Sequence, residues 1–204
     1  MATISKTQGA SLVSLQTLAS AAVVLGAATD VSTKLAATVF IHVGRTVTTA
    51  LTNGVKCRIE GSAKGSLDGY WFSLAEFITA VAASTTTANL TAGTTAGDTV
   101  LPMTATAGIV IGDKVYIREA GAEVDSEFGR VKLVTANTSV TIEDGTLFNH
   151  TITTSRVWSQ AEFFVAQLDL TAIGRIRVVF DSAYALSGQT VVVEAFMVTG
   201  DSIG

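Results

Sequence analysis

The chain contains few charged residues, one proline and one cysteine. Only 15% of its 204 residues are charged, whereas an ordinary soluble domain has about 25%. The single cysteine, Cys57, excludes an internal disulfide; it alternates with Val55 and Ile59, so we expect it to be a small buried side chain. The 13 lysines and arginines are scattered, and the formal net charge is −4. The basic cluster that nucleic-acid binding requires is missing, so we expect no nucleic-acid partner.

A long apolar run is also missing. The charge-free stretch at residues 7–29 has the small-residue end of a secretory signal. However, Ser11, Ser14 and Gln16 interrupt it, and only Lys6 supplies a preceding positive charge. A membrane span needs about 20 mainly apolar residues. We therefore expect neither a signal nor a membrane partner.

Threonine is abundant: there are 30, together with 18 glycines, and 48% of the residues are hydrophobic. Threonine, valine and isoleucine favour strands because a branched β-carbon suits a pleated surface and loses χ1 freedom in a helix. An apolar chain with so few charges suggests a surface covered by partners. The alternative is a large filled core beneath a surface of threonine, serine and glycine.

Alternating residues predict an antiparallel, all-β outer body. In "NGVKCRIEGSA", apolar and charged residues alternate from Val55 to Glu60, and Asn53-Gly54 is a hairpin signal because both residues tolerate positive φ. "YWFSLAEF" (70–77) is compatible with a strand or a short amphipathic helix, and we favour the strand. Further strands are expected at residues 39–43, 174–181 and 190–198.

The run "STTTANLTAGTTAGDTV" (84–100) predicts the entrance to a second unit. Short strands follow it at spacings of roughly ten residues, which is typical of a small barrel or sandwich. They are expected at 99–103, 114–118, 130–134, 139–143 and 151–157. "YWFSLAEF" before this series and "VWSQAEFF" after it are interpreted as outer strands that leave and return. We therefore expect a discontinuous outer β-sandwich (1–83 and 158–204) with a small β domain inserted at 84–157.

Residues able to support catalysis are few. His42 lies mid-strand and is expected to be half-buried, whereas His150 is expected to be exposed in a polar turn. The group Glu119, Glu123, Asp125 and Glu127 departs from the calcium-loop pattern, so a solvated loop is favoured over a Ca²⁺ site. "GSAKGSLDG" (61–69) lacks the ending of a phosphate loop. We predict no catalytic, metal or cofactor site, and no enzyme activity.

Three stretches resemble proteins of tailed-bacteriophage particles, specifically head decoration or cement proteins. "AGDTVLPMTATAGIVIGDKVYIRE" with "EFGRVKLVTANTSVTIEDGTL" is similar to small β modules of phage structural proteins. "LDLTAIGRIRVVFDSAYALSGQTVVVEAFMVTGDS" resembles the closing strands of a virion β-sandwich, and "TVFIHVGRT…KCRIEGSA" fits its earlier strands.

This resemblance implies a jelly-roll-like sandwich, a homo-oligomer such as a trimer, and the major capsid protein as partner. The location would be the capsid surface, after synthesis in the host cytoplasm, and residues 7–29 would form an arm across an adjacent subunit, ordered on assembly. Two alternatives remain open. One is a tail or neck component; the other is a carbohydrate- or receptor-binding β module that uses Tyr70, Trp71 and Phe72, unless these three belong to the core.

Overall fold

The computed structural model describes residues 6–7, 11–18, 22–46, 50, 54–63, 70–80, 87–182 and 191–201. Within these ranges the regular structure is strand, apart from one 3₁₀ turn, η1 (Glu123–Asp125). Every strand pair is antiparallel, as the sequence predicted.

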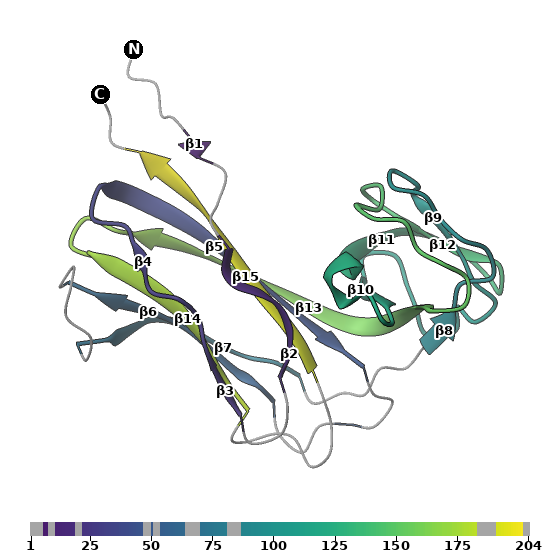
Figure 1. Cartoon of the computed structure of the whole chain (residues 1–204), viewed down its shortest axis with the longest axis horizontal. Helices are drawn as coiled ribbons and strands as arrows, with labels where there is room; N and C mark the ends of the chain where they lie inside the picture. The colour runs from purple at the N-terminus through teal and green to yellow at the C-terminus, as the bar shows by residue number, and fades with distance from the viewer. Residues whose placement is uncertain are drawn as a thin grey trace.

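Two sheets pack face to face in the main body (Figure 1). The first sheet contains β1 (Lys6–Thr7), β2 (Ser11–Leu18), β15 (Val191–Asp201), β5 (Lys34–Arg45) and part of β13 (Ser155–Asp169). The second contains β3 (Val23–Leu25), β4 (Thr29–Asp30), β14 (Arg175–Asp181), β6 (Lys56–Ser62) and β7 (Phe72–Ile78).

The strand order identifies the sandwich as a jelly roll. The sheets run β2-β15-β5-β13 and β3-β14-β6-β7. Numbered by position along the chain, these eight strands have the orders 1-8-3-6 and 2-7-4-5. This is the double-sheet arrangement formed by two Greek keys. The predicted jelly-roll-like β-sandwich is confirmed.

Alternating side chains fill the space between the two sheets. Val39, Ile41 and Val43 of β5 point inward and are almost completely buried, and Cys57 and Ile59 of β6 face them from the other sheet. Burying a valine or isoleucine side chain contributes about 1.5–3 kcal/mol. The prediction that Cys57 is a small buried side chain is confirmed; burial, with a smaller contribution from the charge of Glu162, raises the pKa of its thiol to about 12.

The N-terminal strands belong to this core, contrary to the expected arm. β2 pairs with β15 of the same chain, from Ser11 opposite Phe196 to Leu18 opposite Val191. Leu12, Val13 and Leu18 are buried in the sandwich. The expectation was wrong for residues 11–18 because their apolar side chains find cover within their own chain.

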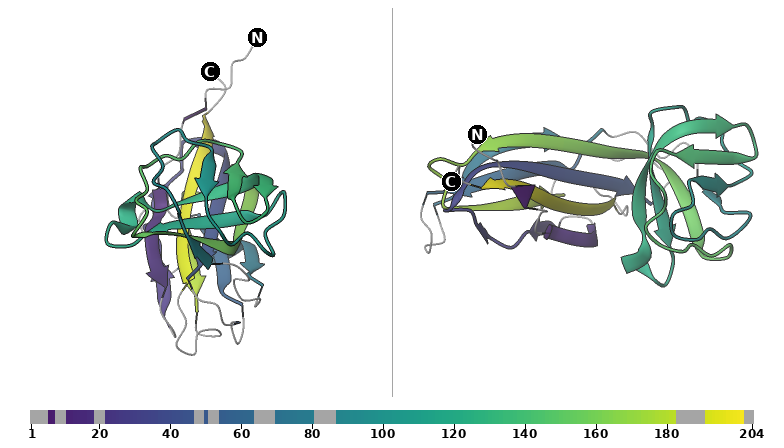
Figure 2. Two further views of the ribbon diagram at one scale, coloured as in Figure 1. Left: turned by 90° about the vertical axis from the view of Figure 1, so that its right-hand side faces the viewer. Right: turned by 90° about the horizontal axis from the view of Figure 1, so that it is seen from above.

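A second group of strands projects from one end of the sandwich (Figure 2). We call residues 87–161 the distal lobe; its strands are β8 (Thr87–Asn89), β9 (Val100–Pro102), β10 (Lys114–Glu119), β11 (Glu127–Thr135), β12 (Ser139–Ile142) and the first half of β13. Their order is β8-β13-β10-β11-β12-β9. A single bridge, Leu90 to Met103, brings β9 toward β8 without a continuous ladder, so the sheet curls but does not close into a barrel. The lobe has a hydrophobic cluster of its own, which includes Leu101, Ile117, Val131 and Val157.

Strand β13 is shared by the lobe and the sandwich. It pairs with β10 from Ser155 to Ala161 and with β5 from Glu162 to Asp169. One extra residue interrupts the β10 register between Trp158 and Ala161, and Gln160 there has a φ of 63°. Such a bulge bends a strand and increases its twist. The pairing therefore changes partner four residues beyond the expected boundary at 157.

The strands that border the lobe can be compared with the strand positions expected from the sequence. Residues 72–78 form β7, so the strand interpretation of "YWFSLAEF" is confirmed. Within the threonine-rich run, residues 87–89 form β8, whereas residues 84–86 lie outside the described part. Residues 152–154 form a turn, so β13 begins four residues later than expected.

Gly54 is required for close packing, not for its backbone angle. Asn53 lies outside the described residues, and Gly54 is absent from the glycines with positive φ, so the structural reason for the glycine differs from the one predicted. A Cβ at position 54 would lie 2.0 Å from the carbonyl oxygen of Thr79.

We expect Gly54→Ala to lower the free energy of unfolding by about 1–3 kcal/mol, because overpacking must displace the backbone at Thr79. The control is Gly93→Ala, whose Cβ would lie 3.1 Å from the nearest atom, the carbonyl oxygen of His150. Urea denaturation measures both variants. Equal losses would contradict the role given to the contact with Thr79.

Candidate functional site

A cluster of ionisable side chains is buried in the distal lobe. His150 lies between Glu119 and Glu127, and the three side chains are 0%, 8% and 5% exposed. The imidazole Nε2 is 2.8 Å from Glu127 Oε1 and donates to it. Nδ1 lies 3.5 Å from Glu119 Oε2 without making a hydrogen bond. The cluster holds β10 and β11 against the segment that leads into β13.

Hydroxyl groups surround the Glu119 carboxylate. It accepts hydrogen bonds from the hydroxyls of Thr151, Thr154 and Ser155 and from the backbone N–H of Thr151. Burial on its own would raise the pKa of Glu119. The hydrogen bonds from Ser155, Thr154 and Thr151 outweigh burial and lower the pKa to about 2, because they stabilise the charged form.

Glu127 holds the neighbouring loop. Its carboxylate accepts the backbone N–H groups of Leu147 at 2.8 Å and Phe148 at 3.3 Å. A carboxylate–histidine pair is able to transfer protons in an enzyme. Here the side chains are covered, so a substrate has no access to them. The arrangement acts as a structural clamp.

Two sequence-based expectations about this region were wrong. His150 is buried, not exposed, and Glu119 and Glu127 are buried rather than part of a solvated loop. Asp125 is half-buried, and Glu123 begins η1. The missed signal was alternation: Glu119 follows Val115 and Ile117 on the inward face of β10, and Glu127 shares its face with Val131 of β11. Nothing in the sequence indicated that His150 would be buried between these two carboxylates.

Aromatic side chains join the lobe to the sandwich. Tyr116 and Phe128 of the lobe pack with Phe163 of β13, and His42 of β5 contacts both Phe128 and Phe163, with ring centroids 5.1 and 4.2 Å apart. His42 is 17% exposed, which confirms the expected half-buried position, and its Nδ1 lies 2.7 Å from Glu194 Oε1. A Cβ on Gly44 would lie 2.9 Å from Tyr116. This close packing restrains the lobe against the sandwich.

The outward face of the first sheet carries an apolar patch beside the polar pair His42–Glu194. Phe196, Phe40 and Val165 lie side by side across β15, β5 and β13. The rings of Phe40 and Phe196 stack with centroids 5.0 Å apart, and Val165 is 54% exposed. Beside them is a groove of about 590 Å³, and Asp169 alone among its lining residues carries a charge.

The distal lobe also exposes aliphatic side chains. Leu133 of β11 and Val100 of β9 flank Thr141 of β12 in one row across the strands, and both are about half exposed. Val110, Ile111 and Leu147 are more exposed still, at 61–72%. Large contiguous apolar patches mark interaction surfaces, whereas single exposed apolar side chains are ordinary.

The three aromatic residues that could form a sugar-binding surface differ in their exposure. Tyr70 and Phe72 are 62% and 46% exposed, so they are not part of the core. Trp71 is half-buried, and its ring lies 4.1 Å from the guanidinium carbon of Arg177. The structure therefore leaves two of the three rings accessible.

In the part of the chain that the structure describes, no group of three or more histidine, cysteine, aspartate or glutamate side chains is placed to hold a metal ion. Among the same residues, no helix has the length and apolar character needed to cross a membrane.

Comparison with known proteins gives no family. No family model matches the chain, and no curated protein matches it. Solved structures give weak matches with low TM-scores. The SPBc2 prophage-derived protein YomS has a TM-score of 0.30 at 9% identity, with 97% of this chain and 96% of that chain covered.

Two viral structures also match. For VP17, a capsid protein of bacteriophage P23-77, the TM-score is 0.21 at 8% identity, covering 97% of this chain and all of VP17. For the structure of the infectious bursal disease virus Gx strain, the TM-score is 0.24 at 12% identity, covering 98% of this chain and 41% of that one. Because all three TM-scores are below 0.5, the proposal below rests on the chain's own features.

Proposed function

We propose that the protein is a non-enzymatic structural component of a tailed-phage particle, and specifically a decoration or cement protein that binds the major capsid protein. The observation that carries the proposal is a jelly roll with an apolar patch on its outward sheet face, at Phe40, Val165 and Phe196. Jelly rolls occur in viral capsid and lectin domains. Because fold alone does not fix function, the exposed apolar patch is the deciding feature.

The apolar surfaces are better suited to repeated contacts with other protein subunits than to a free monomer in solution. Only 15% of the residues are charged, and exposed aliphatic side chains occur on both the sandwich and the lobe. We propose a homo-oligomer such as a trimer, with the protein made in the host cytoplasm and placed on the capsid surface. We also propose that residues 84–157 are an inserted domain, within an outer domain formed by 1–83 and 158–204.

Charge substitutions on the two exposed surfaces test which of them assembles. We expect Val165→Lys to abolish oligomers, because a lysine at the centre of a buried apolar contact loses its hydration. Leu133→Lys in the lobe is the matched control, since Leu133 is exposed to a similar extent, 51% against 54%. Light scattering after size-exclusion chromatography gives the mass. A wild-type protein that stays monomeric at high concentration would contradict the proposed homo-oligomer.

The position in the particle needs a separate experiment. In a phage that encodes the chain, antibodies against it should label the heads of purified particles in electron micrographs. The protein should also bind heads assembled without it and sediment with them. Labelling of tails or necks would favour the alternative assignment, and particles without label would overturn the structural role.

Carbohydrate binding remains the second candidate, because Tyr70 and Phe72 are exposed and aromatic rings stack on apolar sugar faces. A glycan array tests it directly. Binding that disappears in Tyr70→Ala and survives in Val165→Lys would favour this function over assembly.

A further inference from the structure

A small cavity on the outward face of the distal lobe brings two arginines together. Arg118 of β10 and Arg156 of β13 are directly opposite each other in the strand register. With Asn89, Thr153 and Trp158 they line a cavity of about 220 Å³. Like charges directly opposite in a sheet destabilise it. Arg118 has a further contact in the structure, so Arg156 is the candidate donor to an anion.

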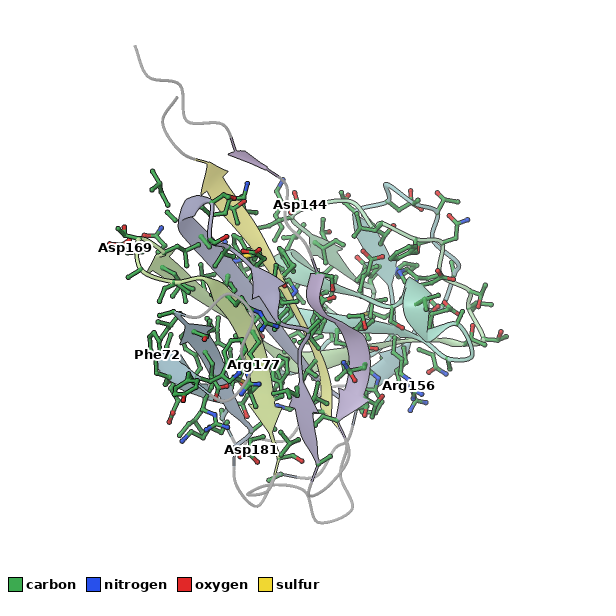
Figure 3. The ribbon with its side chains drawn as sticks, turned by 60° about the vertical axis from the view of Figure 1, so that its left-hand side comes forward. Phe72, Asp144, Arg156, Asp169, Arg177 and Asp181 are labelled. Carbon is green, nitrogen blue, oxygen red and sulfur yellow. The ribbon has the colours of Figure 1, made fainter. Side chains whose placement is uncertain are left out.

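Arg156 is held in place but has no carboxylate partner among the described residues. Its Nε donates to Asn89 Oδ1 at 2.9 Å, and its guanidinium carbon lies 5.6 Å from the ring centre of Trp158. The Asn89 bond uses one edge of the guanidinium and leaves the edge with the two terminal nitrogens available. Figure 3 shows Arg156 projecting from the lobe.

Trp158 lies next to Arg156 at this cavity. The residue is 6% exposed and lines the cavity. Its indole N–H is buried and has no hydrogen-bond partner in the structure. Buried polar groups usually have partners, but the indole N–H of Trp71 beside Arg177 is also buried without one. The Trp158 N–H therefore serves as a reporter next to the cavity, and Arg156 is the donor that a ligand would meet.

A related arrangement on the second sheet already contains a carboxylate, which binds the guanidinium edge that includes Nε. Arg177 lies over Trp71 at 4.1 Å, and Arg175 approaches the same ring at 5.6 Å. There, Glu60 Oε2 accepts hydrogen bonds from Arg177 Nε at 2.8 Å and Nη2 at 2.7 Å. An arginine stacked on a tryptophan is thus bound by a carboxylate. Stacking and paired hydrogen bonding to carboxylates are both characteristic of arginine.

We propose that the Arg156–Trp158 cavity is a binding site for a carboxylate group supplied from outside the chain. The cavity is smaller than the roughly 300–1,000 Å³ of typical small-molecule pockets, so it suits one small anionic group. Arg156 supplies the charge and the donor pair, Arg118 adds positive potential, and Asn89 fixes the guanidinium. The site does not depend on the proposed virion role.

The indole N–H signals of the two tryptophans give a direct test by ¹H–¹⁵N NMR of the full chain. Trp158→Phe assigns the signals. On titration with sodium acetate at neutral pH, we expect the Trp158 signal to shift to saturation and the Trp71 signal to stay in place, because Glu60 already occupies Arg177. Sodium chloride at matched ionic strength should produce no saturating shift.

Arg156→Gln should weaken acetate binding by about tenfold or more, since a hydrogen bond to a charged group contributes about 1.5–3 kcal/mol. Arg130→Gln is the matched control: this arginine is exposed on the same lobe and is paired with Glu143 at 3.3 Å, so its loss should leave binding unchanged. Unaltered backbone amide signals establish that each variant is folded. Arg156→Lys is a second variant, which keeps the charge without the planar fork and should also bind more weakly.

Three results would overturn the proposal. They are the absence of a saturating shift with acetate, an equal response to chloride, and undiminished acetate binding by both Arg156 variants. Saturation with sodium phosphate but not with acetate would overturn the assignment of a carboxylate.

Discussion

Glu162→Ala should lower the free energy of unfolding by about 3–5 kcal/mol, the usual cost of breaking a buried ion pair. Its partner, Arg45, is only 1% exposed. Arg45 Nη2 lies 2.9 Å from Glu162 Oε2 and donates to the carbonyl oxygen of Ala80 at 2.6 Å. Without Glu162, a buried guanidinium loses its counter-charge. The backbone N–H of Ala80 also loses its carboxylate acceptor.

The comparison with Arg45→Met separates charge from packing. In that variant Glu162 loses its counter-charge but keeps the hydrogen bond from the backbone N–H of Ala80, and its side chain is 25% exposed, so that water solvates part of its charge. We therefore expect a smaller loss than in Glu162→Ala, and the double variant Arg45→Met/Glu162→Ala should be more stable than Glu162→Ala alone. Urea denaturation at neutral pH measures all three. A Glu162→Ala protein within about 1 kcal/mol of wild type would contradict the role given to the pair.

Acid should destabilise the protein through Glu119. Its pKa is lowered from 4.5 to about 2, so the folded state binds the proton less readily than the unfolded state. The stabilisation is fully present above pH 4.5, declines as the pH falls from 4.5 to 2, and is absent below pH 2. A lowering of this size corresponds to about 3 kcal/mol.

Glu119→Gln tests this pH dependence. The variant should be less stable than wild type at pH 7, and its stability should fall less between pH 5 and pH 2. The control Glu143→Gln removes an exposed carboxylate, paired only with Arg130 at the surface, and should keep the wild-type profile. Urea unfolding at a series of pH values gives the curves. Parallel profiles for Glu119→Gln and wild type would exclude Glu119 as the source of acid sensitivity.

Local patterns predicted most of the strands but not the side chains that meet across them. The alternation of Val55, Cys57 and Ile59 predicted β6 and its buried face, which the structure confirms. The core position of Leu12 and Leu18 was missed because the charge-free stretch 7–29 was interpreted as an arm; Ser14 and Gln16 lie between the two leucines. These polar residues occupy the outer side of a strand at the edge of its sheet.

The clusters depended on long-range register. Glu119 and His150 meet because separate segments of the lobe converge, and Arg45 meets Glu162 across 117 positions of the sequence. A local sequence pattern cannot show that two residues so far apart in the sequence are in contact. The pairing of Arg118 with Arg156 likewise follows from the register of β10 on β13, so the cavity between them was not visible in the sequence.

The shared strand β13 has a mechanical consequence. Its second half is paired with β5 from Glu162 opposite Val43 to Asp169 opposite Ala36, while its first half lies in the lobe. A force that pulls the lobe along β13 therefore loads the hydrogen bonds between β13 and β5 together, in shear. Tension on the lobe therefore passes along β13, the edge strand of the first sheet, into its neighbour β5, because no flexible linker separates the lobe from that strand.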